Sequence, residues 1–215
     1  MSNKELIATI TEAVIRQLQN SQDNRKIPVG VSNRHVHLSR EDVEKLFGVK
    51  ANLTNFKDLS QPGQFVCEER VTLVGSKGVI EKVRVLGPVR NQTQVEISAG
   101  DGIKLGVQAP LRDSGDLASS ASITLVGPVG SVTLGEGTIV VARHIHMHTK
   151  DAREWGLKNK QRVSVQVSGP RGLVFSEVLV RVSNDCKLEM HIDIDEANAA
   201  FLGNDSYVEI LSNNN

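Results

Sequence analysis

The feature of this sequence that most constrains its fold is an internal repeat. The segment VSNRHVHLSREDVEKL, residues 31–46, aligns without gaps with VVARHIHMHTKDAREW, residues 140–155. In each copy a β-branched run ends in Arg-His-x-His and leads into a segment with helix-capping signals. A chain that uses one strand–helix unit twice is expected to form two related folding units.

Short apolar runs alternate with glycine-rich turns along most of the chain. Four of these turns, VGSKG, LGPVR, VGPVG and SGPRG, follow runs rich in Val, Ile and Thr, which are typical of strands. We expect Gly to supply an unusual backbone angle in these turns and Pro to stop strand pairing. Many short strands with few helices predict a mainly β fold of two related β-barrels, capped by short helices.

The N-terminal segment has a different pattern. Apolar residues recur at helical spacing at Leu6, Ile7, Ile10, Val14 and Leu18, which predicts an amphipathic helix. The polar stretch NSQDNRK, residues 20–26, follows as a linker. Two interpretations stay open: residues 1–23 form a docking or targeting tail, or the helix packs on its own domain.

Composition excludes several classes of function. Lys plus Arg equals Asp plus Glu at 25 each, and aromatic residues are only 3%, so a nucleic-acid partner is not expected. No apolar run reaches membrane-spanning length, and no signal peptide is visible. Cys67 and Cys186 have no CxxC partner, which favours a reduced, cytosolic protein. Cys67 could be a nucleophile, but a small buried residue is the favoured interpretation.

The two His-x-His pairs are candidate metal ligands. His35 and His37, like His144 and His146, point to one face of a strand, because side chains alternate along it. Neutral imidazole is a common zinc ligand. Alternatively, these histidines terminate strands and bond the backbone; their repetition favours metal.

A third polar motif lies near the C-terminus. LEMHIDIDEANAA, residues 188–200, alternates Glu189, His191, Asp193 and Asp195 with apolar residues, which predicts one polar strand face that needs cations or donors. The alternative is a solvent-facing strand. His148 is either a further ligand or a helix cap, and the cap is favoured, with Thr149 as the other cap candidate.

Taken together, the long motifs resemble those of the PduL-type phosphotransacylases, the phosphate propanoyltransferases of bacterial microcompartments. The motifs are IPVGVSNRHVHLS, LSQPGQF, VTLVGSKG, VRVLGPVRNQTQVEIS, APLRDSGDL, ARHIHM and LEMHIDIDEANAA, from about Ile27 to the C-terminus. The resemblance implies one barrel formed by residues 24–33 with 142–212, and a second formed by residues 34–141.

The resemblance also implies a site with two zinc ions per chain at the interface of the barrels. Carried onto this sequence, the ligands are His35, His37, Glu96, His144, His146 and His191. Arg90 is the implied phosphate-binding and catalytic residue. Glu96 and Arg90 rest on the resemblance alone.

The implied reaction converts acyl-CoA and phosphate into acyl phosphate and CoA, with propanoyl-CoA and also acetyl-CoA as acyl donors. Direct attack of phosphate on the thioester needs no protein nucleophile. The alternatives are a zinc-dependent hydrolase such as a thioesterase, and a non-catalytic metal-binding protein associated with a shell.

The N-terminal helix resembles segments that deliver enzymes into bacterial microcompartments. The protein is therefore expected in a microcompartment or in the cytoplasm, with shell or core proteins as partners of residues 1–20. There it would regenerate CoA during propanediol or ethanolamine-type aldehyde metabolism. Assembly into a homo-oligomer is expected as well.

Overall fold

The computed structural model describes residues 4–7, 9–12, 14 and 25–211. Six strands close into a first barrel, here called barrel 1, in the order β1-β13-β10-β12-β11-β14. These strands are β1 (Lys26–Ser32), β10 (His144–His148), β11 (Arg162–Val167), β12 (Leu173–Ser183), β13 (Glu189–Asp193) and β14 (Tyr207–Ile210).

The central part of the chain forms a second barrel, barrel 2. Its ring runs β4-β5-β2-β6-β9-β8 and closes because β8 pairs with both β9 and β4. The ring strands are β2 (His35–His37), β4 (Phe65–Val74), β5 (Val79–Gly87), β6 (Gln94–Glu96), β8 (Ala121–Val126) and β9 (Ser131–Val141). Two short strands, β3 (Asn55–Asp58) and β7 (Leu111–Arg112), attach to β4 and β9. The predicted fold class of two β-barrels with short helices is confirmed.

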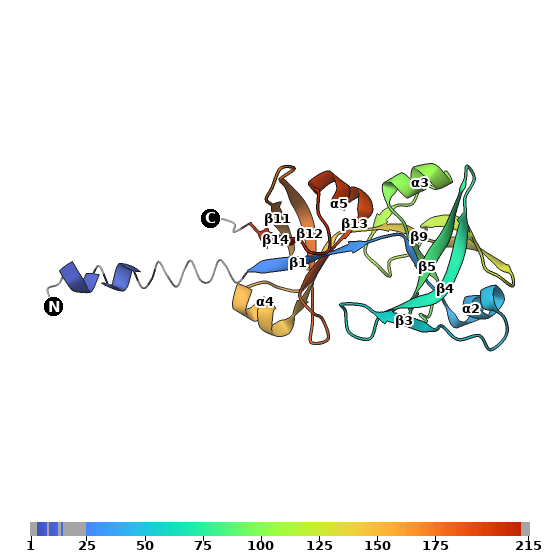
Figure 1. The fold of residues 1–215 in the computed structure, drawn as a ribbon, viewed down its shortest axis with the longest axis horizontal. Helices are drawn as coiled ribbons and strands as arrows, with labels where there is room; N and C mark the ends of the chain where they lie inside the picture. Colours follow the sequence, from blue (N-terminus) through green and yellow to red (C-terminus); the bar gives the residue numbers. More distant parts are fainter. Residues whose placement is uncertain (1–3, 8, 13, 15–24, 212–215) are drawn as a thin grey trace.

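Four short helices each follow directly on a barrel strand (Figure 1). They are α2 (Arg40–Phe47) after β2, α3 (Ala99–Leu105) after β6, α4 (Thr149–Trp155) after β10 and α5 (Ile194–Ala200) after β13. Their N-caps are Ser39, Ser98, His148 and Asp193. The strand–cap–helix unit therefore occurs four times among the described residues, twice in each barrel.

The chain passes between the barrels at both His-x-His motifs. Figure 1 shows β1 running from the lobe of α4 and α5 toward the lobe of α2 and α3. The chain leaves barrel 1 after β1 and enters barrel 2 at His35; it returns from β9 and enters barrel 1 at His144. Both histidine pairs consequently start a strand at the junction of the two barrels.

Each barrel has its own hydrophobic core. The barrel 2 core includes Leu38, Leu46, Leu73, Leu105 and Leu125, all with no exposed surface. The barrel 1 core includes Ile27, Ile145, Met147, Val165 and Met190, which are equally buried. Each fully buried side chain of this size contributes about 1.5–3 kcal/mol through removal of apolar surface from water. Because each barrel is stabilised by its own core, the polar residues between the barrels are not needed to form a hydrophobic core.

Two of the repeated turns need glycine for space, and the expected unusual backbone angle is absent there. Gly75 and Gly127 have no left-handed φ. A Cβ on Gly75 would lie 2.1 Å from the Leu105 carbonyl oxygen, and one on Gly127 would lie 2.4 Å from that of Leu46. The turns cover the C-terminal ends of α3 and α2, so close approach is the physical reason for glycine. In SGPRG, Gly169 does have a φ of 121°.

The prediction of one continuous polar strand face at residues 189–195 is wrong. Strand β13 ends at Asp193, whose side chain caps α5 by accepting from the Glu196 N–H. Asp195 therefore lies in the first turn of the helix, where its carboxylate accepts from the Gly100 N–H at 2.7 Å. Only Glu189, His191 and Asp193 share the strand, because the capping box of Asp193 and Glu196 starts a helix.

The described residues between 4 and 14 are helical, as predicted for an amphipathic N-terminal helix. The side chains of Leu6, Ile7, Ile10 and Val14 are 49–63% exposed. Leu18 and the linker to residue 24 lie outside the described residues. In the part of the chain that is described, no helix has the length and hydrophobicity needed to cross a bilayer.

The exact division into residues 24–33 with 142–212 and residues 34–141 stays our proposal for the domain boundaries.

Candidate metal centre

The first candidate metal cluster, the barrel 2 triad, consists of His35, His37 and Glu96. Strands β2 and β6 pair antiparallel with His35 opposite Glu96, so the three side chains share one face. The Glu96 carboxylate lies 3.2 Å from His35 Nε2 and 3.7 Å from His37 Nε2. His35 Nδ1 lies 2.8 Å from the Asn33 carbonyl oxygen. Because a carbonyl only accepts, Nδ1 donates, which leaves the Nε2 lone pair for a cation.

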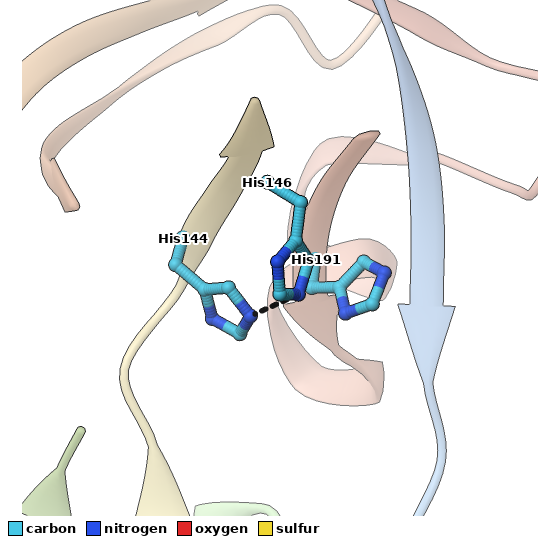
Figure 2. A group of neighbouring side chains, drawn as sticks. All are labelled: His144, His146 and His191. Atoms are coloured by element: carbon cyan, nitrogen blue, oxygen red, sulfur yellow. Dashed lines mark hydrogen bonds between the residues drawn. The ribbon is translucent and has the colours of Figure 1, made fainter. Parts of the chain in front are cut away.

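The second cluster, the barrel 1 triad, consists of His144, His146 and His191. Figure 2 shows His144 and His146 from β10 beside His191 from the adjacent β13. The Nε2 atoms of His144 and His146 are 3.1 Å apart. His144 Nδ1 contacts the Ala142 carbonyl oxygen at 2.9 Å, the same arrangement as in His35. This triad differs from the first in having no carboxylate among its three donors.

In the barrel 2 triad a histidine and a carboxylate shift each other's pKa. Burial disfavours the charged form of both partners, yet the pKa of Glu96 is lowered by His35 and the pKa of His35 is raised by Glu96. Burial and the neighbouring His35 lower the pKa of His37 to about 3. His37 is therefore neutral near pH 7, the form that binds metal ions.

In the barrel 1 triad, burial favours the neutral forms of His144 and His146. Burial, together with the Arg181 charge, lowers the pKa of His144 well below its usual range. Burial and the adjacent His191 lower the pKa of His146 to about 4. Glu189 accepts a hydrogen bond from His191 at 2.6 Å. Although burial opposes its ionisation, that bond and those from Ser60 and Gln61 lower the pKa of Glu189 to about 2.

The arginines that precede the two histidine pairs orient the helices. Arg34 Nε lies 2.7 Å from the carboxylate of Asp101, and Arg143 Nη1 lies 2.6 Å from that of Glu196. Both acids belong to the capping boxes of α3 and α5. The Arg of each Arg-His-x-His motif therefore fixes the second helix of its own barrel.

Both triads line a single cavity of about 500 Å³ between the barrels, together with Arg90 and Arg181. Among the described residues, the Arg90 guanidinium reaches only Ser114 Oγ, at 3.5 Å, and the Arg181 guanidinium reaches only Asp113, at 3.9 Å. One terminal nitrogen of Arg181 is buried without a hydrogen-bond partner among the described residues. Burial lowers the pKa of both guanidiniums, but each remains charged. Two weakly paired cations in one cavity indicate an anion-binding site.

The donor sets fit zinc. Two histidines with a carboxylate and three histidines are both known zinc ligand sets with an open position. Zn–N bonds of the usual length place neighbouring ligand atoms about 3.3 Å apart in a tetrahedron. The distances of 3.1, 3.2 and 3.7 Å in the two triads are close to that value.

The structure thus brings all seven predicted site residues to one cavity: His35, His37, Arg90, Glu96, His144, His146 and His191. His148 is outside the triads and acts as the N-cap of α4, accepting from the Lys150 N–H at 3.0 Å. Cys67 is fully buried, and burial raises the pKa of its thiol to about 12. The favoured interpretations of His148 and Cys67 agree with this geometry.

Residue-level reasoning missed Glu96, Arg90 and Arg181. For Glu96 a signal existed, because Gln94-x-Glu96-x-Ser98 has the spacing of His35-x-His37-x-Ser39 and ends in a helix cap at the same place. Arg90 follows β5 and Arg181 lies within β12, both in ordinary β sequence that carries no motif. Only the closure of the two barrels places them beside the triads.

The fold and the paired clusters define a double β-barrel protein with two candidate metal sites beside two arginines. A family model described as phosphate propanoyltransferase matches residues 28–203. The chain is 53% identical over 207 residues to a phosphate propanoyltransferase of Thermotoga maritima, covering 94% of this chain and 99% of that protein. It is 54% identical to a protein of the same name from Priestia megaterium, with 93% of each chain covered. This chain belongs to the phosphate propanoyltransferase family and is a transferase.

Proposed function

We propose that the protein interconverts acyl-CoA plus phosphate with acyl phosphate plus CoA at a two-zinc site formed by the two triads. Propanoyl-CoA is the main acyl donor, since the relatives carry that name, and acetyl-CoA is a second. The two acyl groups differ by one methylene, which a pocket distinguishes by only about 1–3 kcal/mol. The observation that carries the proposal is the joining of Arg90, Arg181 and both triads in one cavity.

The side chains of the cavity suit a direct transfer. Zinc at the triads would supply Lewis acidity toward a carbonyl, phosphate or thiolate. Arg90 holds phosphate through its planar fork, and Arg181 balances charge from the facing barrel. A phosphate oxygen forms the new C–O bond, the C–S bond breaks, and the CoA thiolate leaves and takes up a proton. His35 and His144, fixed by backbone carbonyls, keep their tautomers throughout.

The protein environment supports direct attack over an acyl-enzyme. Cys67 is buried in the barrel 2 core, and burial raises the pKa of the Cys186 thiol as well. Ser114 lines the cavity but hydrogen-bonds Gln94 and lacks a histidine partner among its described bonds. Ping-pong kinetics or a trapped acyl-enzyme would contradict this mechanism.

The experiment that tests the function follows thiol release from propanoyl-CoA with and without phosphate, before and after metal chelation. We expect release that requires phosphate, disappears on chelation and returns with zinc. Release without phosphate would instead indicate a thioesterase. A folded, zinc-loaded protein that releases no thiol from either acyl-CoA would overturn the proposal.

We also propose that residues 1–20 deliver the enzyme into a bacterial microcompartment by binding shell or core proteins, and that the enzyme assembles into a homo-oligomer. The exposed apolar side chains of Leu6, Ile7, Ile10 and Val14 support a docking role. A variant lacking residues 1–20 that still entered shells would contradict delivery, and a monomeric mass by light scattering would contradict self-association.

A further inference from the structure

Two histidines of the barrel 1 triad are oriented by different kinds of group. His144 donates to the backbone carbonyl of Ala142 at 2.9 Å. His191 instead contacts a carboxylate, with Nε2 2.6 Å from Glu189 Oε2. Because the ionised carboxylate accepts only, His191 donates from Nε2, and its Nδ1 lone pair is left for a cation. Glu189 itself is not among the three donors of the cluster, so it lies behind His191.

Glu189 is held in turn by the other barrel. Ser60 and Gln61, in the segment of barrel 2 that joins β3 to β4, both donate to Glu189 Oε2, Gln61 at 3.2 Å. Gln61 is 5% exposed and also bonds the backbone of Lys187 in both directions, at 3.0 and 3.2 Å. One carboxylate oxygen therefore accepts from two donors of barrel 2 and from the imidazole of His191.

Strand β1 leaves room for this arrangement. It pairs parallel with β13, with Gly30 opposite His191. A Cβ on Gly30 would lie 3.0 Å from Glu189 Cδ and 3.0 Å from His191 Cδ2, tighter than an ordinary contact. Glycine at position 30 thus leaves space for the paired side chains of Glu189 and His191. The backbone of β1 is therefore adapted to this pair.

We propose that Glu189 is the positioning residue of the barrel 1 metal site: it fixes the tautomer and the orientation of His191 and connects them to barrel 2 through Ser60 and Gln61. This inference rests on the proposed zinc-binding role of the triads. A carboxylate behind a metal-bound imidazole raises the basicity of the ligand, and loss of such a partner typically weakens metal affinity about 10- to 100-fold.

The test compares the variants E189Q and D195N by competition of each zinc-loaded protein with a chromophoric chelator. Asp195 is a matched control, because its carboxylate also joins the barrels, through the Gly100 N–H, and has no described bond to a histidine. We expect E189Q to lose one of two zinc ions about 10- to 100-fold more readily than the parent protein. D195N should retain both, and E189D should recover part of the affinity.

A second measurement separates positioning from general loosening. Nitrogen-15 NMR of the imidazoles should show His191 protonated at Nε2 in the parent and in D195N, and a lost or mixed tautomer in E189Q. The variant G30A should shift the same resonances, whereas G135A, at a glycine with nothing within 4 Å of its Cβ position, should not.

Unchanged zinc affinity and an unchanged tautomer in E189Q would overturn the inference. Equal zinc loss in E189Q and D195N would overturn it too, by assigning the effect to contact between the barrels. A parent protein that binds no zinc, or whose phosphate-dependent thiol release survives complete chelation, would overturn the proposed two-zinc function. That outcome is distinct, because it appears before any variant is compared.

Discussion

The barrel 1 and barrel 2 triads share a backbone frame and differ in charge. In barrel 2 the antiparallel pair β2 and β6 presents His35, His37, Gln94 and Glu96; in barrel 1 the pair β10 and β13 presents His144, His146, Glu189 and His191. Barrel 2 uses its carboxylate in the cluster, whereas barrel 1 places its carboxylate behind His191. With zinc bound, the net charge of the barrel 2 triad would be one unit less positive than that of the barrel 1 triad, because Glu96 is an anionic ligand.

This difference shows that the repeated backbone unit determines the positions of the donor side chains, whereas the residue type at each position can vary. Each unit offers two side chains on one strand face before its helix cap. Exchange of the residue at one of these places changes the charge of the cluster with no change of fold. The two halves of the cavity are consequently expected to have different roles, which the following predictions test.

Removal of one ligand from each triad should have the largest effect. We expect H37A and H146A each to lower bound zinc from two ions to one. Loss of several kcal/mol of electrostatic stabilisation should reduce phosphate-dependent thiol release roughly 10³-fold. Zinc analysis and steady-state kinetics measure both, with H148A as the control because His148 lies outside the triads. Retention of two zinc ions in either variant would contradict the ligand assignment.

Removal of the arginines should have the next largest effect. A charge-assisted hydrogen bond contributes about 1.5–3 kcal/mol, so R90A should raise the KM for phosphate roughly 10- to 100-fold. R181A should act in the same direction and less strongly, because Arg181 already lies near Asp113 at 3.9 Å. R112A, at an arginine 3.6 Å from exposed Asp116, serves as the control. A KM for phosphate that neither variant alters would argue against both roles.

The pH dependence of zinc binding should be a smaller effect. Burial lowers the pKa of His35, but the neighbouring Glu96 carboxylate outweighs burial and raises that pKa from its usual 6.5. Zinc must displace a proton from His35 wherever the pH lies below the raised pKa, so the zinc affinity of the barrel 2 triad rises with pH up to that pKa and then levels off. H146A keeps the barrel 2 triad and isolates this dependence. Zinc titrations of H146A at several pH values measure it, and an affinity that does not change with pH would contradict the expectation.

The helix caps should give the smallest difference. Ser39 caps α2 and accepts from the Asp42 N–H at 3.1 Å, so S39A should cost about 1 kcal/mol of the free energy of unfolding. His148 caps α4 with an imidazole, so H148S should be neutral or stabilise by about 0.5 kcal/mol. Urea denaturation measures both. A loss of zinc from H148S would show that His148 is a ligand after all.

Much of the fold could be predicted because its signals are local. The β-branched runs, the glycine turns and the repeated Arg-His-x-His motif lie within short windows of sequence. The strand end at Asp193 was missed, because alternation of polar and apolar residues continues through Asp195 while the capping box of Asp193 and Glu196 starts a helix. Local alternation and capping signals conflicted there, and capping determined the structure.

The site was only partly predictable for a different reason. His35, His37, His144 and His146 belong to a repeat, so their pairing is visible in sequence. Arg181 and Glu189 act through neighbours that are distant in sequence. Arg181 shares the cavity with Arg90, about 90 positions away, and Glu189 accepts from Ser60 and Gln61, 129 and 128 positions away. Such neighbours arise only from closure and docking of the barrels, which leave no trace in a short window.

The passage of the chain from barrel 1 through barrel 2 and back imposes an order on biosynthesis. Strand β1 pairs with β13 and β14, which leave the ribosome last, whereas every strand of barrel 2 is made before β10. Barrel 2, with His35, His37 and Glu96, can close on the ribosome while β1 still waits with an unpaired edge. A translation product that stops short of His191 therefore carries one donor cluster and no complete cavity. A product that ends before β13 is therefore expected to be inactive and to keep β1 with an unpaired edge.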